Sequence, residues 1–184
     1  MPWRSEAKKR CGLDHGTFGD PPHWPGREGV SFSKGETMAE HTPSPRVFAS
    51  PGRYVQGRGA LEELGPLVGR LGSSPLVLTD DVVRDLAGEI LKRSFEKAKV
   101  PLTFERFGGV PTKAESERVA EIIRKGGHDV VIGLGGGAAI DAAKGAGDNA
   151  GVPWVSAATV ASTDAPTSAL SVVYTEEGAF ESYR

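Results

Sequence analysis

The residues that could do chemistry begin with a glycine run behind a short apolar segment. Val130, Val131 and Ile132 are apolar and β-branched, which is typical of a buried strand. Glycines follow at positions 133, 135, 136 and 137, and the small residues from Ala138 to Lys144 favour a helix. A helix that begins at a glycine turn points main-chain N–H groups and the positive end of its dipole at an anion. The spacing therefore predicts a phosphate-binding turn.

A dinucleotide site also requires an acid that binds a ribose hydroxyl. Residues 133–138 match the fingerprint G-x-G-x-x-A, but no Asp or Glu lies about 20 residues further on, where the ordinary Rossmann pattern has it. Asp80 instead directly follows the predicted strand 75–79, at a carboxyl end of the kind where α/β sheets bind ligands. Asp80 and the glycine turn could hold one dinucleotide if their strands are neighbours. Asp80 could equally be the N-cap of the following helix.

Two further polar groups lie close to the glycine run in sequence. Asp141 and Lys144 are three residues apart on the first turns of the glycine helix, where they either orient the phosphate or form a surface ion pair of little weight. Residues 159–168 carry hydroxyl side chains around Asp164, with Pro166 to stiffen the loop. Such a loop offers hydrogen bonds to a nicotinamide or a polyhydroxy substrate, with Asp164 as an acceptor. The alternative is a set of turns that satisfy their own backbone.

The elements that must position these groups alternate regularly after residue 46. Strands are predicted at 75–79, 102–107, 130–132 and 152–156, and helices at 59–71, 82–98, 113–125 and 138–148. Shorter strands are expected at 46–49 and 54–56, and a hairpin of strands at 170–174 and 179–183. The helix 82–98 is expected to bury Val83, Leu86, Ile90, Leu91 and Phe95. This order predicts a Rossmann-like α/β fold: a parallel sheet with helices on both faces, plus a C-terminal β-hairpin.

Composition limits the remaining classes of function. Residues 1–45 are rich in proline and glycine and lack an apolar period, so we expect a disordered extension before the domain at 46–184. The net charge of -2 gives no reason to expect nucleic acid or an anionic membrane as partner. No apolar run approaches a membrane span, and a single cysteine favours a reducing, cytoplasmic location. The histidines and the cysteine show no metal-binding spacing.

The segments 133–144 and 159–175 together resemble the glycerol dehydrogenases of the iron-containing (group III) alcohol dehydrogenase superfamily. The glycine motif, Gly133-Leu-Gly-Gly-Gly-Ala-Ala-Ile-Asp-Ala-Ala-Lys144, is shared across that superfamily, including its dehydroquinate synthase-like relatives. The block Ser162-Thr-Asp-Ala-Pro166 is narrower and is similar to the glycerol branch. The resemblance begins near residue 47 and runs to residue 184. It implies NAD-dependent oxidation of glycerol to dihydroxyacetone.

The resemblance also implies a set of binding residues. Asp80 would bind the adenosine ribose, and Asp164 would face the hydroxyl groups of glycerol. The residues implied at the pyrophosphate are Gly135, Gly136, Gly137, Ala138, Ala139, Ile140 and Asp141. Those implied on the adenine and nicotinamide sides are Thr159, Val160, Ala161, Ser162, Ser168, Leu170 and Tyr174. Glycerol dehydrogenases often have Lys-Thr where this chain has two alanines, so one cation beside the phosphates is missing and weaker binding is expected.

A divalent metal, zinc or iron, is implied for full-length members of the family, which are homo-oligomers. The family holds this metal through an Asp and two His of a C-terminal helical domain, which is expected beyond Arg184. Residues 46–184 are therefore expected to be the NAD-binding half, without catalytic residues and inactive alone. Two alternatives remain: an NAD-binding fragment or pseudoenzyme without catalysis, and a dehydroquinate synthase-like lyase. The block 162–166 argues against the lyase.

Overall fold

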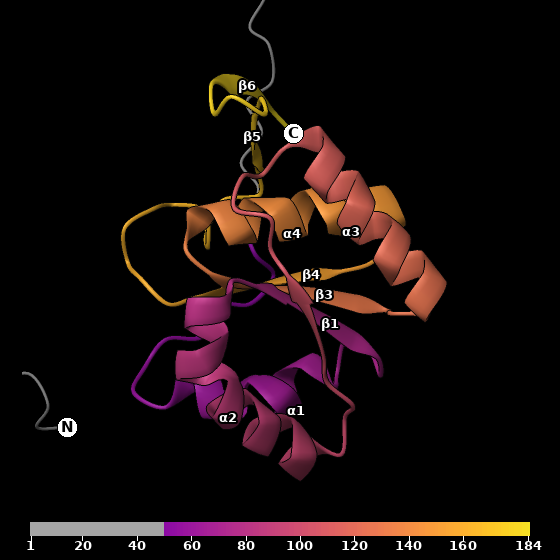
Figure 1. The fold of residues 1–184 in the computed structure, drawn as a ribbon. Coiled ribbons are helices and arrows are strands. Elements are labelled where there is room, and N and C mark those ends of the chain that lie inside the picture. Colours follow the sequence, from indigo (N-terminus) through magenta and orange to yellow (C-terminus); the bar gives the residue numbers. More distant parts are fainter. Residues whose placement is uncertain (1–49) are drawn as a thin grey trace, which may run out of the picture. The chain divides into compact units, whose positions relative to one another are not determined.

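The computed structural model describes residues 50–184, and its central element is a four-stranded parallel sheet (Figure 1). The strands are β1 (Pro75–Thr79), β2 (Thr103–Arg106), β3 (Val130–Gly135) and β4 (Trp154–Ala158). Their spatial order is β2-β1-β3-β4, and each adjacent pair is parallel. Every residue of β1 and β3 is buried, as expected for central strands that are covered on both faces.

Helices cover both faces of this sheet (Figure 1). The 3-10 turn η2 (Ala60–Glu63) leads into α1 (Leu64–Val68), which packs with α2 (Asp81–Ala98) on one face. The helices α3 (Lys113–Gly126) and α4 (Gly137–Ala150) pack on the other face. None of the helices in residues 50–184 is long and apolar enough to cross a membrane.

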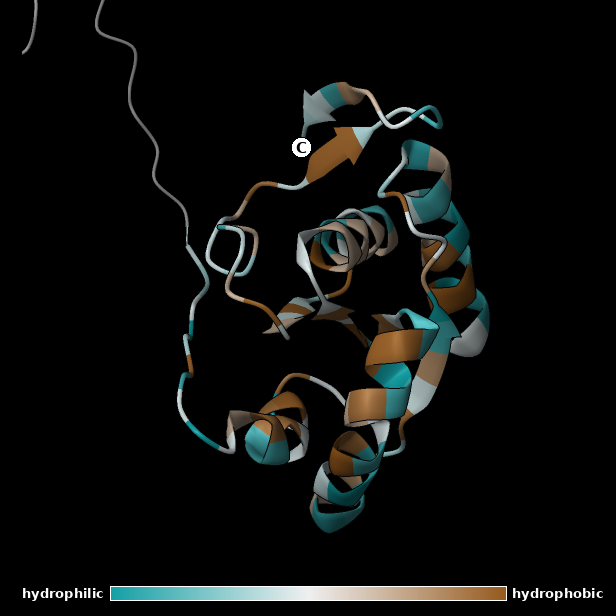
Figure 2. Cartoon of the chain, turned by 60° about the vertical axis from the view of Figure 1, so that its left-hand side comes forward, coloured by the Kyte–Doolittle hydropathy of each residue, from teal (hydrophilic) through white to brown (hydrophobic). Residues whose placement is uncertain are grey.

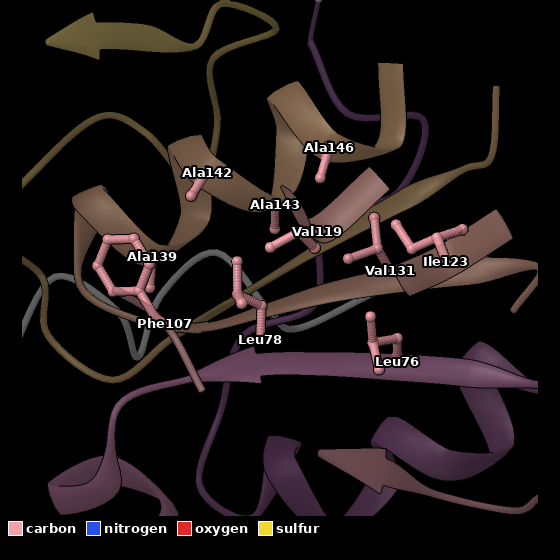
Figure 3. Packing of buried hydrophobic residues seen from close by; sticks show 10 residues of the cluster. All are labelled: Leu76, Leu78, Phe107, Val119, Ile123, Val131, Ala139, Ala142, Ala143 and Ala146. Atoms are coloured by element: carbon pink, nitrogen blue, oxygen red, sulfur yellow. The ribbon is translucent and has the colours of Figure 1, made fainter. Parts of the chain in front are cut away.

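The sheet separates two clusters of buried apolar side chains. Leu76 and Leu78 of β1 point to the α3 and α4 side, whereas Val77 points to the α1 and α2 side, because successive side chains of a strand alternate between faces. Figure 3 shows the first cluster, which comprises Leu76, Leu78, Phe107, Val119, Ile123, Val131, Ala139, Ala142, Ala143 and Ala146. Four alanines in this set let α4 approach the sheet closely.

A separate hairpin follows the sheet at the C-terminal end. The strands β5 (Val172–Tyr174) and β6 (Phe180–Tyr183) pair antiparallel, with an irregularity between Val173 and Tyr174. β5 is hydrophobic (Figure 2), and Val173 is buried, so the hairpin contributes to packing beside α4. The predicted fold, a Rossmann-like parallel sheet with helices on both faces and a C-terminal hairpin, is confirmed.

Three local predictions are wrong. Residues 54–56 form no strand and are exposed. The helix expected at 59–71 is divided into η2 and α1 and ends at Val68, so Leu71 is outside it and exposed. Leu86 lies on the solvent side of α2 with 76% of its surface exposed, because the buried stripe of this helix runs through Ala87, Leu91 and Phe95. The expected extension at 1–45 and strand at 46–49 lie outside the described residues.

Candidate functional site

The glycine turn ends β3 and opens α4 without a side-chain cap. Gly136 is the N-cap residue of α4, and among residues 50–184 no side chain accepts a hydrogen bond from the first turn there. In contrast, Asp80 caps α2 through a 2.8 Å bond from the Val83 N–H, and Thr112 caps α3 through a 3.0 Å bond from the Glu115 N–H. The first N–H groups of a helix have no partner inside it. At α4 these groups are therefore available to an anion.

The shape of the turn requires glycine at positions 135 and 137, whereas position 136 has room for a side chain. Gly135 has a φ of 149°, which L-residues rarely adopt. A Cβ at Gly136 would meet nothing closer than Val160 Cγ2 at 3.9 Å, so the space in front of this residue is open. A Cβ at Gly137 would instead lie 3.0 Å from the Thr163 side chain. The turn is thus bordered by residues of the 159–168 loop and is open at Gly136.

Asp80 and the glycine turn lie at the same edge of the sheet. β1 and β3 are neighbours, and their parallel register pairs Leu78 with Gly133. Asp80 and Gly135 are each two residues further along, so they end level at the carboxyl edge. Asp80 is the N-cap of α2, as the alternative interpretation predicts, because its Oδ1 accepts the hydrogen bond from the Val83 N–H. Within the described residues Oδ2 has no hydrogen-bond partner, so the cap leaves half of this partly buried carboxylate available.

The hydroxyl-rich loop begins at the glycine turn and is largely folded on itself. The Thr159 N–H donates to the Gly135 carbonyl at 3.0 Å. Thr163 Oγ1 accepts from the Ala165 N–H, and Ser168 Oγ accepts from the Leu170 N–H. The alternative of self-satisfied turns therefore holds for these two side chains. Residues 158–164, including Asp164, are exposed.

Asp141 and Lys144 are buried, so the surface ion-pair interpretation is wrong. Their residues are 6% and 3% exposed, and Lys144 Nζ lies 3.8 Å from Asp141 Oδ1. Nζ donates to the main-chain carbonyls of Ser168 at 2.8 Å and Leu170 at 2.7 Å. It also lies 5.2 Å from the centre of the Trp154 ring. Because α4 packs under the 168–173 segment, a position that local sequence places on a helix surface is in fact interior.

Burial shifts both side chains toward their neutral forms. Burial raises the pKa of Asp141, although the nearby Lys144 ammonium and the Val172 N–H act in the opposite direction. Burial likewise lowers the pKa of Lys144, against the attraction of Asp141 and Asp164. The loss of hydration on burial is thus the largest influence on the pKa of both Asp141 and Lys144.

The structure brings together most, but not all, of the predicted site residues. The glycine turn, the start of α4, Asp80 and the beginning of the 159–168 loop meet at the carboxyl edge. Tyr174 is on β5, where its N–H donates to the Pro111 carbonyl at 3.1 Å. Sequence reasoning missed Ser171, whose hydroxyl donates to the Asp141 carbonyl at 2.8 Å. The sequence offers one indication of this residue, which is that the Ser171 hydroxyl directly precedes the apolar residues of a predicted strand.

A metal site is not found among the described residues, where no group of three or more His, Cys, Asp or Glu side chains gathers. The predicted absence of metal-binding spacing rested partly on His15, His23 and His41, which lie outside the described residues.

The parallel sheet, the helices on both its faces and the helix that opens from a glycine turn define a doubly wound α/β domain, a class that binds ligands at the carboxyl edge of its sheet. Residues 51–184 match the family described as iron-containing alcohol dehydrogenase, and the chain belongs to this family. The dehydroquinate synthase-like lyase stays an untested alternative, because such relatives share the glycine motif.

The chain is also similar to individual proteins of known name. The chain is 40% identical over 138 residues to a glycerol dehydrogenase of Pseudomonas putida, covering 75% of this chain and 38% of the relative. It is 41% identical over 137 residues to a glycolaldehyde reductase of Halobacterium salinarum, covering 74% of this chain and 38% of the relative. A crystal structure of a probable glycerol dehydrogenase from Sinorhizobium meliloti 1021 is 38% identical, with a TM-score of 0.68, over 76% of this chain and 38% of that one. The chain thus spans 38% of the length of these relatives.

Proposed function

We propose that residues 50–184 form the NAD-binding half of a polyol oxidoreductase that oxidises glycerol to dihydroxyacetone. The observation that carries this proposal is the open first turn of α4, level with Asp80 at the carboxyl edge of the sheet. The names of the relatives support the choice of glycerol as substrate. The same proposal includes a cytoplasmic location, since a dehydrogenase of this kind draws on the NAD of the cytosol, and a homo-oligomeric full-length protein.

The proposed cofactor fits the groups that the chain offers. The uncapped N–H groups from Gly136 to Ala139 would hold the diphosphate, assisted by the positive end of the α4 dipole. Asp80 would accept a hydrogen bond from the adenosine ribose through Oδ2. The open space at Gly136 admits a phosphate oxygen close to the backbone. The remaining proposed contacts are Gly135, Gly137, Ala138, Ile140, Asp141, Thr159, Val160, Ala161, Ser162, Ser168, Leu170 and Tyr174.

The roles of these residues in the reaction are binding and orientation. When bound, NAD supplies the acceptor for the hydride that leaves the carbinol carbon of the polyol, while the hydroxyl proton leaves to solvent or a base. Asp164, exposed on the loop beside the turn, would accept a hydrogen bond from a substrate hydroxyl. The described residues contain no set of ligands that fits the metal of the family.

Titration with NAD tests the binding site directly. In Gly136→Ala, the added Cβ meets only Val160 at 3.9 Å and the backbone φ of -80° suits alanine, so the fold should be retained. The methyl group would occupy the path of the diphosphate, and we expect the Kd for NAD to rise by about tenfold or more, or about 1.4 kcal/mol. Gly52→Ala, where a Cβ meets nothing within 4 Å, is the matched control. Equal affinity of both variants and the parent chain would contradict the site.

A turnover assay distinguishes an enzyme from a binding module. Because the chain spans 38% of its relatives, we expect it to bind NAD without forming NADH from glycerol unless the rest of the family fold is present. Glycolaldehyde, the substrate class named for another relative, is the comparison compound in the reductive direction. NADH formation from glycerol by the 184-residue chain alone would overturn the expectation that it is only the binding half.

A further inference from the structure

The ammonium group of Lys144 is buried at a junction between α4 and the chain that follows the hydroxyl-rich loop. Nζ donates to the carbonyls of Ser168 and Leu170, and it lies over the ring of Trp154. A buried charge is costly unless it is paired and hydrogen-bonded. Apolar packing could fill the same volume at lower cost. We therefore interpret this buried cation as a group that is kept for its hydrogen bonds to the main chain of residues 168–170.

Asp141 connects the same segment to the preceding turn of α4. Its carbonyl accepts a 2.8 Å hydrogen bond from Ser171 Oγ. Asp141 Oδ1 is buried, has no hydrogen-bond partner within the described residues, and lies 3.8 Å from Lys144 Nζ. Three hydrogen bonds thus tie residues 168–171 to the first two turns of α4.

The other end of the loop is tied to the same structural unit. Thr159 donates to the carbonyl of Gly135 at 3.0 Å, so the loop begins at the glycine turn. Between these anchors residues 159–164 are exposed, and Thr163 borders Gly137. The hydrogen bonds of Lys144 therefore lie at the far end of a loop whose near end is bonded to the glycine turn.

We propose that Lys144 is a positioning residue, which fixes the segment 168–172 on α4 and thereby sets the loop 159–168 beside the phosphate-binding turn for cofactor binding. Lys144 acts through the main chain and touches neither cofactor nor substrate. The effect on affinity rests on the proposed function, whereas the tether itself does not.

The test compares Lys144→Met with Lys92→Met in the 184-residue chain. Lys92 also pairs with an acid three residues away, Glu89, but on the surface. For Lys144→Met we expect amide hydrogen exchange of residues 167–172 to be at least tenfold faster, with β1 and β3 still protected. We also expect the Kd for NAD to rise about tenfold. In a Trp3→Phe, Trp24→Phe background, loss of the cation should shift the fluorescence emission of Trp154. Lys92→Met should change none of these quantities.

Ser171→Ala gives a second test if Lys144→Met does not fold. It removes one tether bond and leaves the cation in place, so smaller increases in exchange and in Kd are expected. Unchanged exchange at 167–172 in the folded variants would overturn the tether. Faster exchange with unchanged affinity would reduce Lys144 to a structural role and overturn positioning. If the parent chain itself fails to bind NAD, the proposed function fails, and the exchange data alone still decide whether the tether exists.

Discussion

At the scale of single residues, Asp80 combines two roles that local sequence presents as alternatives. One carboxylate oxygen accepts the Val83 N–H and caps α2, and the other is free within the described residues. An N-cap fixes the side chain in one orientation, so the free oxygen is held at the carboxyl edge of β1 without a further loss of conformational freedom on binding. The cap thus preorganises the proposed ribose contact.

Substitution at Asp80 separates the cap from the ribose contact. Asp80→Asn keeps a good capping acceptor but loses the negative charge, so we expect weaker NAD binding with little change in Tm. Asp80→Ala should weaken binding and also lower the free energy of unfolding by about 0.5–2 kcal/mol. Thr112→Ala removes the corresponding cap of α3 and should destabilise without affecting affinity. NAD affinity of Asp80→Asn equal to that of the parent chain would remove Asp80 from the site.

At the scale of elements, the contact between β3 and α4 sets the position of the glycine turn, where we propose that the diphosphate binds. A Cβ added at Gly133 would lie 2.8 Å from Ile140 Cα and 2.9 Å from Ala143 Cβ, closer than real contacts allow. Glycine at this position lets the helix rest on the strand backbone. Gly88, by contrast, is inside α2, where an added Cβ would meet only Arg84 Cγ at 3.8 Å.

Alanine substitutions at these two glycines should have opposite effects. Gly133→Ala forces α4 away from β3, and we expect a loss of about 1–3 kcal/mol in the free energy of unfolding together with weaker NAD binding. Gly88→Ala should raise the free energy of unfolding by about 0.5–1 kcal/mol, because alanine costs less entropy in a helix. Denaturant titration measures the free energy of unfolding of both variants. A stable Gly133→Ala variant would show that the close packing is not required.

At the scale of the whole domain, a charge network joins α3 to the end of β2. Glu115 is buried and accepts hydrogen bonds from the Gly108 N–H at 2.9 Å and from Arg118 Nε at 2.8 Å. Burial acts to raise its pKa, but the hydrogen bonds from Arg118 and Gly108 outweigh burial, so the pKa lies below the ordinary value of 4.5. The folded state therefore binds fewer protons at Glu115 than the unfolded state in acid.

This shift predicts the acid limb of the stability curve. The contribution of ionised Glu115 is fully present above pH 4.5 and is lost as the pH falls toward its lower, folded-state pKa. Glu115→Gln should lower the free energy of unfolding by about 1–3 kcal/mol at neutral pH, and this deficit should narrow below pH 4.5. Glu121→Gln, at an exposed pair with Lys125, is the control and should change little. A deficit independent of pH would contradict the charge network.

Sequence alone predicts the parts of the molecule that depend on local pattern. Apolar runs and caps identify β1, β3 and the start of α3, because burial and capping are encoded within a few residues. Burial of Lys144 depends on residues 168–172 and could not be read from its neighbours on α4. The exposure of Leu86 likewise depends on which stripe of α2 packs against the rest of the domain. Contacts between segments distant in sequence decide such positions.

The burial of the middle of α4 has a consequence for motion. Residues from Ala139 to Gly147 are all buried, so packing fixes the part of this helix that lies behind the glycine turn, whereas Gly136 to Ala138 are partly or fully exposed. Residues 158–164 are exposed as well, and they border the glycine turn through Thr159 and Thr163. A change in shape that accompanies entry and exit of a ligand is therefore expected in the exposed turn and loop, since movement of the buried part of α4 would require the domain itself to open.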